Sequence, residues 1–425
     1  MYFIEAIMIL VGLIMLGVPV GFALGLAGIA CLMLLVPFNV VLQLSQKVIH
    51  ETATNHAFLT VPMFVLMAEF MGMGAVTRDL MLACNRLLYR VRGGMAMACV
   101  MAGTVLAAAS GSSTATAVTI TRSAYPTMRL AGYSPSFAIG SIAISGTLAM
   151  MIPPSVAFVL YGLMTESSIG KLFMAGITPG LLTAAGYILT ISFMLWWKPE
   201  LGPDRAKEAE LANSKERTRV WPVGLLVAII LTALYTGVAT PTEISAIGAT
   251  GALLICLYLR RLNGPKAVKA IGNTIRTTAM IMTIIFSAHM FGYYISFSRV
   301  TDTMLQWIVS EGYAPTTVLL AVVLVYLFLG MVMDQAAIII LTAPITAPLM
   351  AGLGYDPIWW GVIIVKTAEI GMVTPPMGLN VYVASASSGV DLNRTFRGIA
   401  PFVVTELIIL GLLLMFPAIP LFLVQ

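Results

Sequence analysis

Residues 371–378 read Gly-Met-Val-Thr-Pro-Pro-Met-Gly and lie inside a long apolar run, 359–386, that otherwise has the composition of a membrane helix. Proline cannot donate a backbone hydrogen bond and clashes with the preceding turn, so one proline costs a helix interior about 3 kcal/mol. Two in succession predict a broken helix. They also leave the carbonyl groups four residues back, on Gly371 and Met372, without their helical donors.

The composition is typical of a polytopic α-helical membrane protein. Of the 425 residues, 59% are hydrophobic and 10% are charged, whereas soluble domains carry about 25% charge. Apolar stretches of the roughly 20 residues that span a bilayer recur along most of the chain. The longest polar interval, 198–219, has the length of a loop. No separate soluble domain is expected.

Several functional classes are disfavoured by the ionisable and sulfur-containing residues. The net charge of +5 comes from basic residues scattered among loops, which indicates membrane topology rather than nucleic-acid binding. Four cysteines show no paired spacing and are expected to pack within helices, and three separated histidines do not form a transition-metal site. No Gly-x-x-x-x-Gly-Lys-Ser/Thr loop is present, so an ionic energy source is expected.

The chain contains an internal duplication with a shift of 222 positions. The shift places Pro153-Pro154 on Pro375-Pro376 and Gly176-Ile177 on Gly398-Ile399. Between 115 and 183, 15 of 69 positions are identical, and seven of these are glycine or proline. Hydrophobic composition alone would not align those residues. The sequence therefore predicts two diverged repeats, 1–197 and 221–425, joined by the polar linker 198–220.

The distribution of basic residues predicts that the second repeat is inverted. Basic residues flank both ends of the apolar block 93–128, whereas the corresponding block 316–350 has almost none near it and the basic cluster lies earlier, at 260–276. If basic clusters face the cytoplasm, the two blocks enter from opposite faces and each returns to its own face. We expect two re-entrant helical hairpins and a cytoplasmic linker.

Five crossings then remain in each repeat, an odd number that inverts the second. Scaffold helices are expected within 1–92 and 221–315. The predicted crossings are 3–16, 19–36, 57–75, the broken helix 135–165 and 174–197, with counterparts at 222–238, 241–259, 277–297, the broken helix 358–386 and 400–424.

Inverted repeats with interrupted helices indicate a transporter whose binding site lies near the bilayer midplane. Carbonyls freed by the prolines, on Ala149 and Met150 in the first break and on Gly371 and Met372 in the second, are suited to Na⁺. The N–H groups of the half-helix that follows favour an anion. The alternative is a proline kink whose carbonyls are satisfied by neighbouring helices. Two symmetry-matched breaks favour the binding site.

The hairpin tips are expected to supply the rest of each site. The first tip reads Ser110-Gly111-Ser112-Ser113, and the shift places Asp334 on Ser112. A carboxylate within an apolar stretch is by default a functional candidate, and capping of the second hairpin helix is a compatible role. Lys366 and Glu369, three residues apart, are expected to form an ion pair. Glu69 and Glu243 are interpreted as scaffold or interface residues.

These features resemble the large membrane subunit of tripartite ATP-independent periplasmic (TRAP) transporters, the DctM-like proteins. The resemblance covers essentially the whole chain and is most specific in Gly111-Ser112-Ser113, in Ile152-Pro153-Pro154-Ser155, in 371–380 and in the duplication. It implies an all-α elevator-type fold of the ion transporter superfamily. A transport domain of hairpins and broken helices would slide against a scaffold of the remaining helices.

The resemblance also implies Na⁺-coupled uptake of an organic acid across the bacterial inner membrane, with two or more Na⁺ as coupling ions. One Na⁺ site would fall at Ser110, Ser112, Ser145, Gly146, Ala149, Met150 and Pro154, and the other at Asp334, Thr367, Gly371, Met372, Thr374 and Pro376. The substrate would contact Ser113, Ser155, Thr374 and Asn380. Sialic acid and C4-dicarboxylates are the family substrates to consider, and overall similarity favours sialic acid.

The implied partners are a small four-helix membrane subunit of the DctQ or SiaQ type and a periplasmic substrate-binding protein of the DctP or SiaP type. Because no further helices precede residue 1, the small subunit is expected to be a separate chain. A stand-alone symporter or antiporter of the same superfamily is the alternative. An intramembrane enzyme is a distant one, because Ala108-Ala109-Ser110-Gly111 and Gly330–Asp334 fail the rhomboid and presenilin-type patterns. We do not expect an enzyme.

Overall fold

The computed structural model describes residues 2–73, 76–204, 207–208 and 219–424, and the regular secondary structure of this part is helical throughout. The first repeat contains α1 (Tyr2–Met15), α2 (Val20–Leu35), α3 (Phe38–Thr54), the 3-10 helix η1 (His56–Leu59), α4 (Thr60–Met73), α5 (Val76–Leu88), α6 (Gly94–Ser110), α7 (Ser113–Leu130), α8 (Pro135–Met151), α9 (Val156–Thr165) and α10 (Ile169–Trp197).

The short 3-10 helix η2 (Pro199–Leu201) follows α10. The second repeat contains α12 (Trp221–Thr236), α13 (Pro241–Tyr258), α14 (Gly264–Ser298), α15 (Val300–Ser310), α16 (Pro315–Val332), α17 (Gln335–Gly352), α18 (Pro357–Gly371), α19 (Leu379–Ser388), α20 (Leu392–Met415) and α21 (Ala418–Leu421). Within the described residues, seven helices are long and apolar enough to cross a membrane.

The duplication predicted from the sequence is present in the fold. Each repeat has a helical hairpin (α6–α7 and α16–α17) followed by a helix broken at its Pro-Pro pair (α8–α9 and α18–α19). Gly132 and Gly354, which the shift aligns, both have φ of +90° and begin the turn before the broken helix. Both Pro-Pro bonds are cis. The predicted all-α membrane fold with a hairpin and a broken helix in each repeat is confirmed.

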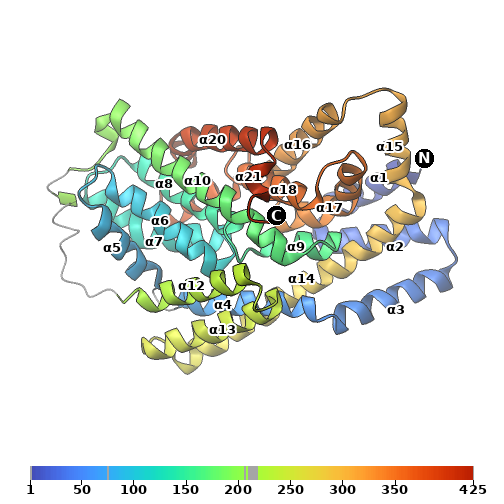
Figure 1. Cartoon of the computed structure of the whole chain (residues 1–425), viewed down its shortest axis with the longest axis horizontal. Coiled ribbons are helices and arrows are strands. Elements are labelled where there is room, and N and C mark those ends of the chain that lie inside the picture. Colours follow the sequence, from blue (N-terminus) through green and yellow to red (C-terminus); the bar gives the residue numbers. More distant parts are fainter. Residues whose placement is uncertain (1, 74–75, 205–206, 209–218, 425) are drawn as a thin grey trace.

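The repeats exchange packing partners as a two-fold relationship requires. Helix α7 packs against α19, and its counterpart α17 packs against α9. In the same way α2 packs against α14, and α13 packs against α4. Figure 1 shows these scaffold helices along the lower and right-hand margins, with the hairpins and broken helices above them. The fold thus contains two bodies, each built from equivalent parts of both repeats.

The repeats differ in the helical segment that precedes each hairpin. Helix α14 runs without interruption for 35 residues, whereas the aligned part of the first repeat is divided into α3 and α4 at Asn55, whose side chain accepts a hydrogen bond from the backbone of Ala57. The segment 277–297, which the sequence predicts as a crossing, is therefore the later part of a helix that begins at Gly264. Residues 264–276 continue into the same helix, because no proline interrupts it after Pro265.

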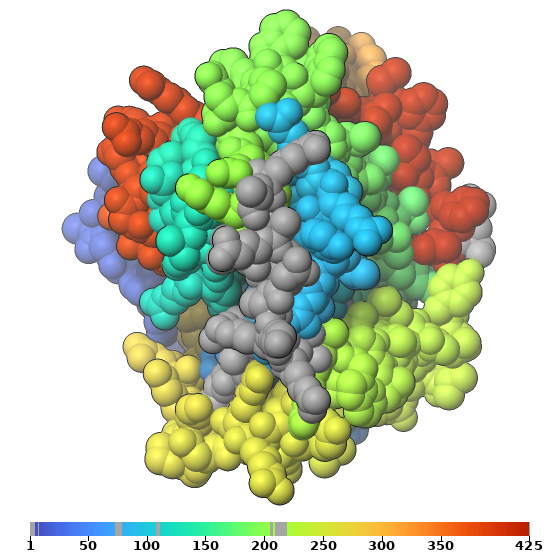
Figure 2. Space-filling model, turned by 90° about the vertical axis from the view of Figure 1, so that its left-hand side faces the viewer, coloured from blue at the N-terminus to red at the C-terminus, as the bar shows by residue number. Residues whose placement is uncertain are grey.

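The chain after α10 folds back over the start of the first hairpin. Glu208 is buried, and its Oε1 accepts hydrogen bonds from the backbone N–H of Met95 (3.0 Å) and from the hydroxyl of Tyr133 (2.6 Å). Burial and the Glu208 carboxylate raise the pKa of Tyr133. Figure 2 shows this end of the molecule, with residues of the first repeat above and residues of α13 and α14 below. The predicted linker 198–220 lies partly outside the described residues.

Glycine contacts bring the helices of the hairpins and broken helices close together; this half of the fold is called the transport body below, after its expected role. A Cβ on Gly371 would lie 2.3 Å from the Cα of Gly330, so α16 and α18 touch backbone to backbone. A Cβ on Gly146 would lie 2.8 Å from the Cβ of Ala117 and 2.9 Å from the carbonyl of Ser113. All four cysteines are free and buried, which confirms their expected packing role.

Candidate functional site: the hairpin tips and helix breaks

The first break lies against the tip of the first hairpin. Helix α8 ends at Met151, and α9 begins at Val156 with Ser155 as its N-cap residue. The hydroxyl of Ser155 donates a hydrogen bond of 2.5 Å to the carbonyl of Met150. A Cβ on Gly111 would lie 3.3 Å from the Val156 side chain and 3.4 Å from the carbonyl of Pro154. The tip and the break are therefore in contact.

The second break folds back on itself. The backbone N–H groups of Thr374 and Asn380 donate to the carbonyls of Gly371 (3.0 Å) and Met372 (3.1 Å). Helix α19 then begins at Leu379, after Gly378, whose φ is +52°. The predicted break and restart are confirmed.

The prediction that the prolines leave their upstream carbonyls open is wrong for three of the four. Those of Met150, Gly371 and Met372 each accept a hydrogen bond from a residue further along the same break. The chain turns tightly enough after each proline pair to return a local donor. A carbonyl oxygen has a second lone pair, so these groups keep the capacity to ligate a cation.

The tip of the first hairpin joins the two repeats. Gly111 has φ of +56°, and Ser112 caps α7 by accepting from the N–H of Ala115 at 3.5 Å. Ser113 is buried, and its hydroxyl accepts a hydrogen bond from the side-chain amide of Asn380, which is also buried. The Oδ1 of Asn380 has no partner within the described part of the chain. The side chain of Ser110, a predicted Na⁺ ligand, lies outside the described residues.

The tip of the second hairpin combines a cap and a buried amide. Asp334 is exposed and caps α17 by accepting from the N–H of Ala336 at 3.3 Å. Gln335 is buried and donates to the carbonyl of Val365 at 3.4 Å, while its Oε1 has no partner among the described residues. The capping role predicted for Asp334 is confirmed. Its carboxylate still has lone pairs directed away from the helix.

The aligned hydroxyls before each break have equivalent bonds. Ser145 and Thr367 are fully buried, and each donates a hydrogen bond of 2.6 Å to the carbonyl four residues earlier in its own helix. Thr374 does the same to Ile370 at 2.6 Å. Because the hydroxyl protons are directed into the helix, the oxygen lone pairs remain for a cation.

A cavity of about 650 Å³ separates these elements from the scaffold. It is lined by both hairpin tips and both breaks, through Ser112, Met150, Asp334 and Met372 among the predicted residues. The opposite wall comes from α4 and α14. The other predicted site residues whose side chains the structure describes lie behind the lining or outside it: Ser113, Ser145, Gly146, Ala149, Pro154, Ser155, Thr367, Gly371, Thr374, Pro376 and Asn380.

The scaffold wall of the cavity carries two lysines and a glutamate. Lys266 and Lys269, read from the sequence as topology signals, line the cavity from the first turns of α14. Glu69 on α4 also lines it and accepts a hydrogen bond of 3.2 Å from the side chain of Asn273. The described lining therefore holds two basic residues on the scaffold side and two carboxylates, Glu69 on the scaffold side and Asp334 at the second tip.

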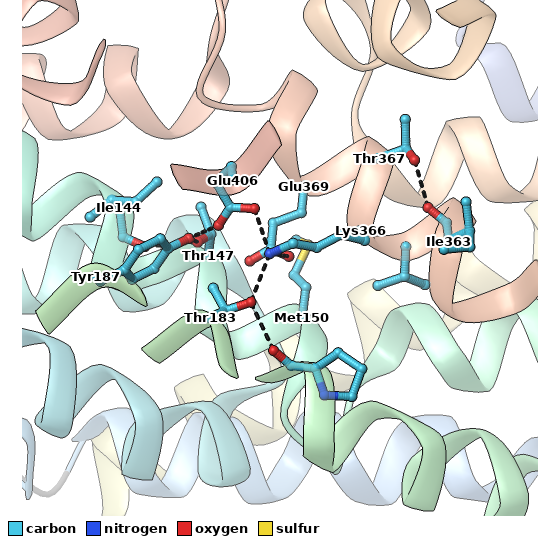
Figure 3. Close-up of polar contacts among 12 residues, drawn as sticks. Ile144, Thr147, Met150, Thr183, Tyr187, Ile363, Lys366, Thr367, Glu369 and Glu406 are labelled. Carbon is cyan, nitrogen blue, oxygen red and sulfur yellow. Dashed lines mark hydrogen bonds and ion pairs between the residues drawn. The ribbon is translucent and has the colours of Figure 1, made fainter. Parts of the chain in front are cut away.

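A buried ionic network lies behind the breaks (Figure 3). Lys366 on α18 contacts Glu406 on α20 at 2.5 Å and Glu369 at 3.3 Å, and donates to Thr183 on α10 at 2.9 Å. The hydroxyl of Tyr187 donates to the other Glu406 oxygen. The expected Lys366–Glu369 pair is confirmed, whereas Glu406 was missed. A lone carboxylate in the apolar run 400–424 was the available signal.

This network connects both repeats at equivalent positions. Thr147 on α8, which donates to the carbonyl of Ile144 at 2.8 Å and is 2.9 Å from the Tyr187 hydroxyl, aligns with Glu369 under the 222-residue shift. All these side chains are essentially inaccessible to solvent. Removing one partner of such a buried pair is costly, so the network fixes α8, α10, α18 and α20 as a unit.

Comparison with known proteins agrees with this geometry. The family described as "Tripartite ATP-independent periplasmic transporter, DctM component" matches residues 7–419. The chain belongs to the DctM family. This establishes a multi-pass membrane permease of the TRAP type for solute uptake. DctM membership also implies a small membrane subunit and a periplasmic binding protein as partners.

Curated relatives of this DctM chain differ in substrate and in organisation. DctM, the C4-dicarboxylate TRAP transporter large permease protein of Pseudomonas aeruginosa, is 36% identical and covers 94% of this chain and 93% of its own. The isethionate permease DctMQ of Oleidesulfovibrio alaskensis is 31% identical over 96% of this chain and 64% of its own. The sialic acid permease SiaM of Vibrio cholerae is 28% identical, with 96% and 94% covered.

Two solved transporters share the fold of this DctM chain. The YdaH transporter of Alcanivorax borkumensis superposes with a TM-score of 0.62 at 16% identity, covering 88% of this chain and 89% of that one. MtrF of Neisseria gonorrhoeae gives the same score and identity, with 90% and 85% covered. At this level of identity the likeness concerns the fold alone.

Proposed function

We propose that this DctM chain performs Na⁺-coupled uptake of a small organic acid, by an elevator movement of the hairpins and broken helices against the scaffold. The observation that carries the proposal is a cavity bounded on one wall by both tips and both breaks and on the other by α4 and α14. A ligand held at the tips would move with the transport body. The two lysines of the scaffold would remain behind.

Two Na⁺ ions are proposed, one at each tip and break. The first would use Ser112 with Ser145 and the carbonyls near Met150; the second would use Asp334 with Thr367 and the carbonyls of Gly371 and Met372. Support comes from the oxygen chemistry, since hydroxyl, carboxylate and carbonyl groups are hard donors that suit hard cations. The equivalent hydrogen bonds of Ser145 and Thr367 support two related sites.

The organic acid is proposed to be a C4-dicarboxylate in the first instance. Lys266 and Lys269 line the scaffold side of the cavity, as does Glu69, and the two lysines supply two cations for two carboxylates. The identity to a C4-dicarboxylate relative, at 36%, exceeds that to the sialic acid relative, at 28%. Sialic acid, which the overall resemblance of the sequence favoured, is the second class to test.

The partners and placement follow the TRAP arrangement. We propose a separate DctQ-type subunit, a DctP-type binding protein, a bacterial inner-membrane location and a cytoplasmic linker at 198–220. The match covers 64% of the DctMQ relative. That protein is therefore longer than the region that matches this chain, as expected if it carries a second permease part in the same polypeptide.

A ligand-binding measurement tests the ion assignment without requiring the partners. The purified chain should unfold at a higher temperature in NaCl than in KCl or choline chloride at equal ionic strength, because a ligand bound by the native state stabilises it. A C4-dicarboxylate should raise the midpoint further only when Na⁺ is present. Equal midpoints in all three salts would contradict coupling to Na⁺.

A further inference from the structure

The outer face of the transport body has a groove between α10 and α20 that no step of transport uses. Its volume is about 950 Å³. Two threonines form a polar patch in it: the hydroxyls of Thr190 and Thr405 lie 2.6 Å apart, so one donates to the other, and the accepting hydroxyl donates to a carbonyl of its own helix. Its walls are apolar and exposed, as at Leu189 and Phe193 on α10 and Val404 and Ile408 on α20.

One end of the groove carries two basic side chains. Lys198, at the end of α10, and Arg397, in the second turn of α20, both line it. Both are exposed, and neither has a side-chain hydrogen bond or ion pair within the described part of the chain. None of the described lining residues is acidic. Trp197 lies beside Lys198 and is 67% exposed, as expected for a residue at the membrane–water interface.

The two ends of the groove lie far enough apart to hold a lipid chain. From Trp197 to Leu182 helix α10 rises by about 22 Å at 1.5 Å per residue, and both residues line the groove. Helix α20 runs alongside in the opposite direction, from Arg397 to Leu412. Basic pockets between membrane helices bind the head groups of anionic lipids. A long apolar trough with a basic end therefore matches an anionic phospholipid.

We propose that this groove binds one anionic phospholipid, with its phosphate at Lys198 and Arg397 and an acyl chain along Thr190 and Thr405. The site moves with the transport body, since α10 and α20 carry Thr183, Tyr187 and Glu406 of the buried network. The inference does not depend on the identity of the transported solute.

Native mass spectrometry of the detergent-purified chain tests the proposal. The probes are phosphatidylglycerol and phosphatidylethanolamine with identical acyl chains, added at equal ratios. The wild type should retain phosphatidylglycerol preferentially. The double variant K198Q/R397Q should bind it about 30-fold more weakly, the loss expected for two basic residues near a membrane surface. The matched double variant R122Q/R394Q removes the same charge from exposed positions outside the groove and should behave as wild type.

The acyl part is tested by filling the groove. Ala185 is an exposed residue of the groove lining, so Ala185→Trp places an indole inside the groove. Leu181→Trp places an indole on the same helix but outside the groove. The first should lose phosphatidylglycerol and the second should keep it. If Ala185→Trp does not fold, the charge pair decides the question alone. Equal retention of both lipids by wild type, equal behaviour of the two double variants, or a dimer that Ala185→Trp dissociates would each overturn the proposal.

Discussion

The side-chain amide of Asn380 donates a hydrogen bond to the hydroxyl of Ser113, which is 267 positions earlier in the chain. Ser113 begins the second helix of the first hairpin, and Asn380 lies in the first turn of α19 beyond the second break. Both side chains are buried. A hairpin tip of one repeat is thereby tied to the broken helix of the other, next to the cavity where we place the substrate.

Loss of this bond should impair transport. Asn380→Ala leaves a buried hydroxyl without its partner, a cost of about 1–3 kcal/mol, and should lower the initial uptake rate about tenfold in proteoliposomes with the small subunit and binding protein. Ser113→Ala should have a similar effect, and the double variant should be no worse than either. The control is Ser123→Ala, because the Ser123 hydroxyl donates to the carbonyl of Thr119 in its own helix. Additive losses would show that the two residues act separately.

Asp334 should reveal separate capping and charge effects. Asp334→Asn retains an oxygen that can cap α17, whereas Asp334→Ala loses the cap at a cost of about 0.5–2 kcal/mol. Without Na⁺, therefore, thermal unfolding should be affected only in the alanine variant. In NaCl, both should lack the stabilisation that the wild type gains over KCl. An asparagine variant with the full Na⁺ response would remove Asp334 from the proposed ion site.

Lys366 should be required for stability rather than for substrate affinity. Lys366→Met leaves Glu406 and Glu369 buried without their cation, and breaking such a pair costs about 3–5 kcal/mol. The midpoint of thermal unfolding should fall sharply, and adding Glu406→Gln should restore part of it. Lys47→Met, which disrupts an exposed pair with Glu51, should change little. A wild-type midpoint for Lys366→Met would contradict the role of the network.

The scaffold lysines should set the affinity for a dianion. Lys266→Gln with Lys269→Gln should raise the KM for succinate-like C4-dicarboxylates about fivefold, the size expected for two exposed charge interactions, and the difference should shrink at high salt. Arg276→Gln, on the same helix but away from the cavity lining, should leave KM unchanged. An unchanged KM in the lysine variant would place anion recognition at the tips alone.

Backbone chemistry made part of this structure predictable from the sequence. Pro153-Pro154 and Pro375-Pro376 break their helices, and Gly132 and Gly354 turn the chain, because these residue types restrict or release the backbone wherever they occur. The duplication then located the hairpin tips. What happens inside each break depends on which donor folds back, so the engagement of the Met372 carbonyl by Asn380 was not predictable.

The roles of Glu406, Lys266 and Lys269 depend on tertiary contacts that the sequence does not show. Glu406 aligns with Ala184, so the repeat gave no sign of it, and its partners on α10 and α18 become neighbours only in the fold. Lys266 and Lys269 match the pattern of topology signals, and their place in the cavity follows from the packing of α14 beside α17 and α4.

Uptake into proteoliposomes measures Na⁺-coupled transport and its dependence on the partners together. The chain is reconstituted with its small subunit, and the binding protein loaded with a labelled C4-dicarboxylate is added outside, with an inward Na⁺ gradient or with K⁺ in its place. We expect accumulation that requires all three proteins and the Na⁺ gradient. Equal accumulation with K⁺, or uptake by the chain without its partners, would refute Na⁺-coupled uptake of the TRAP type.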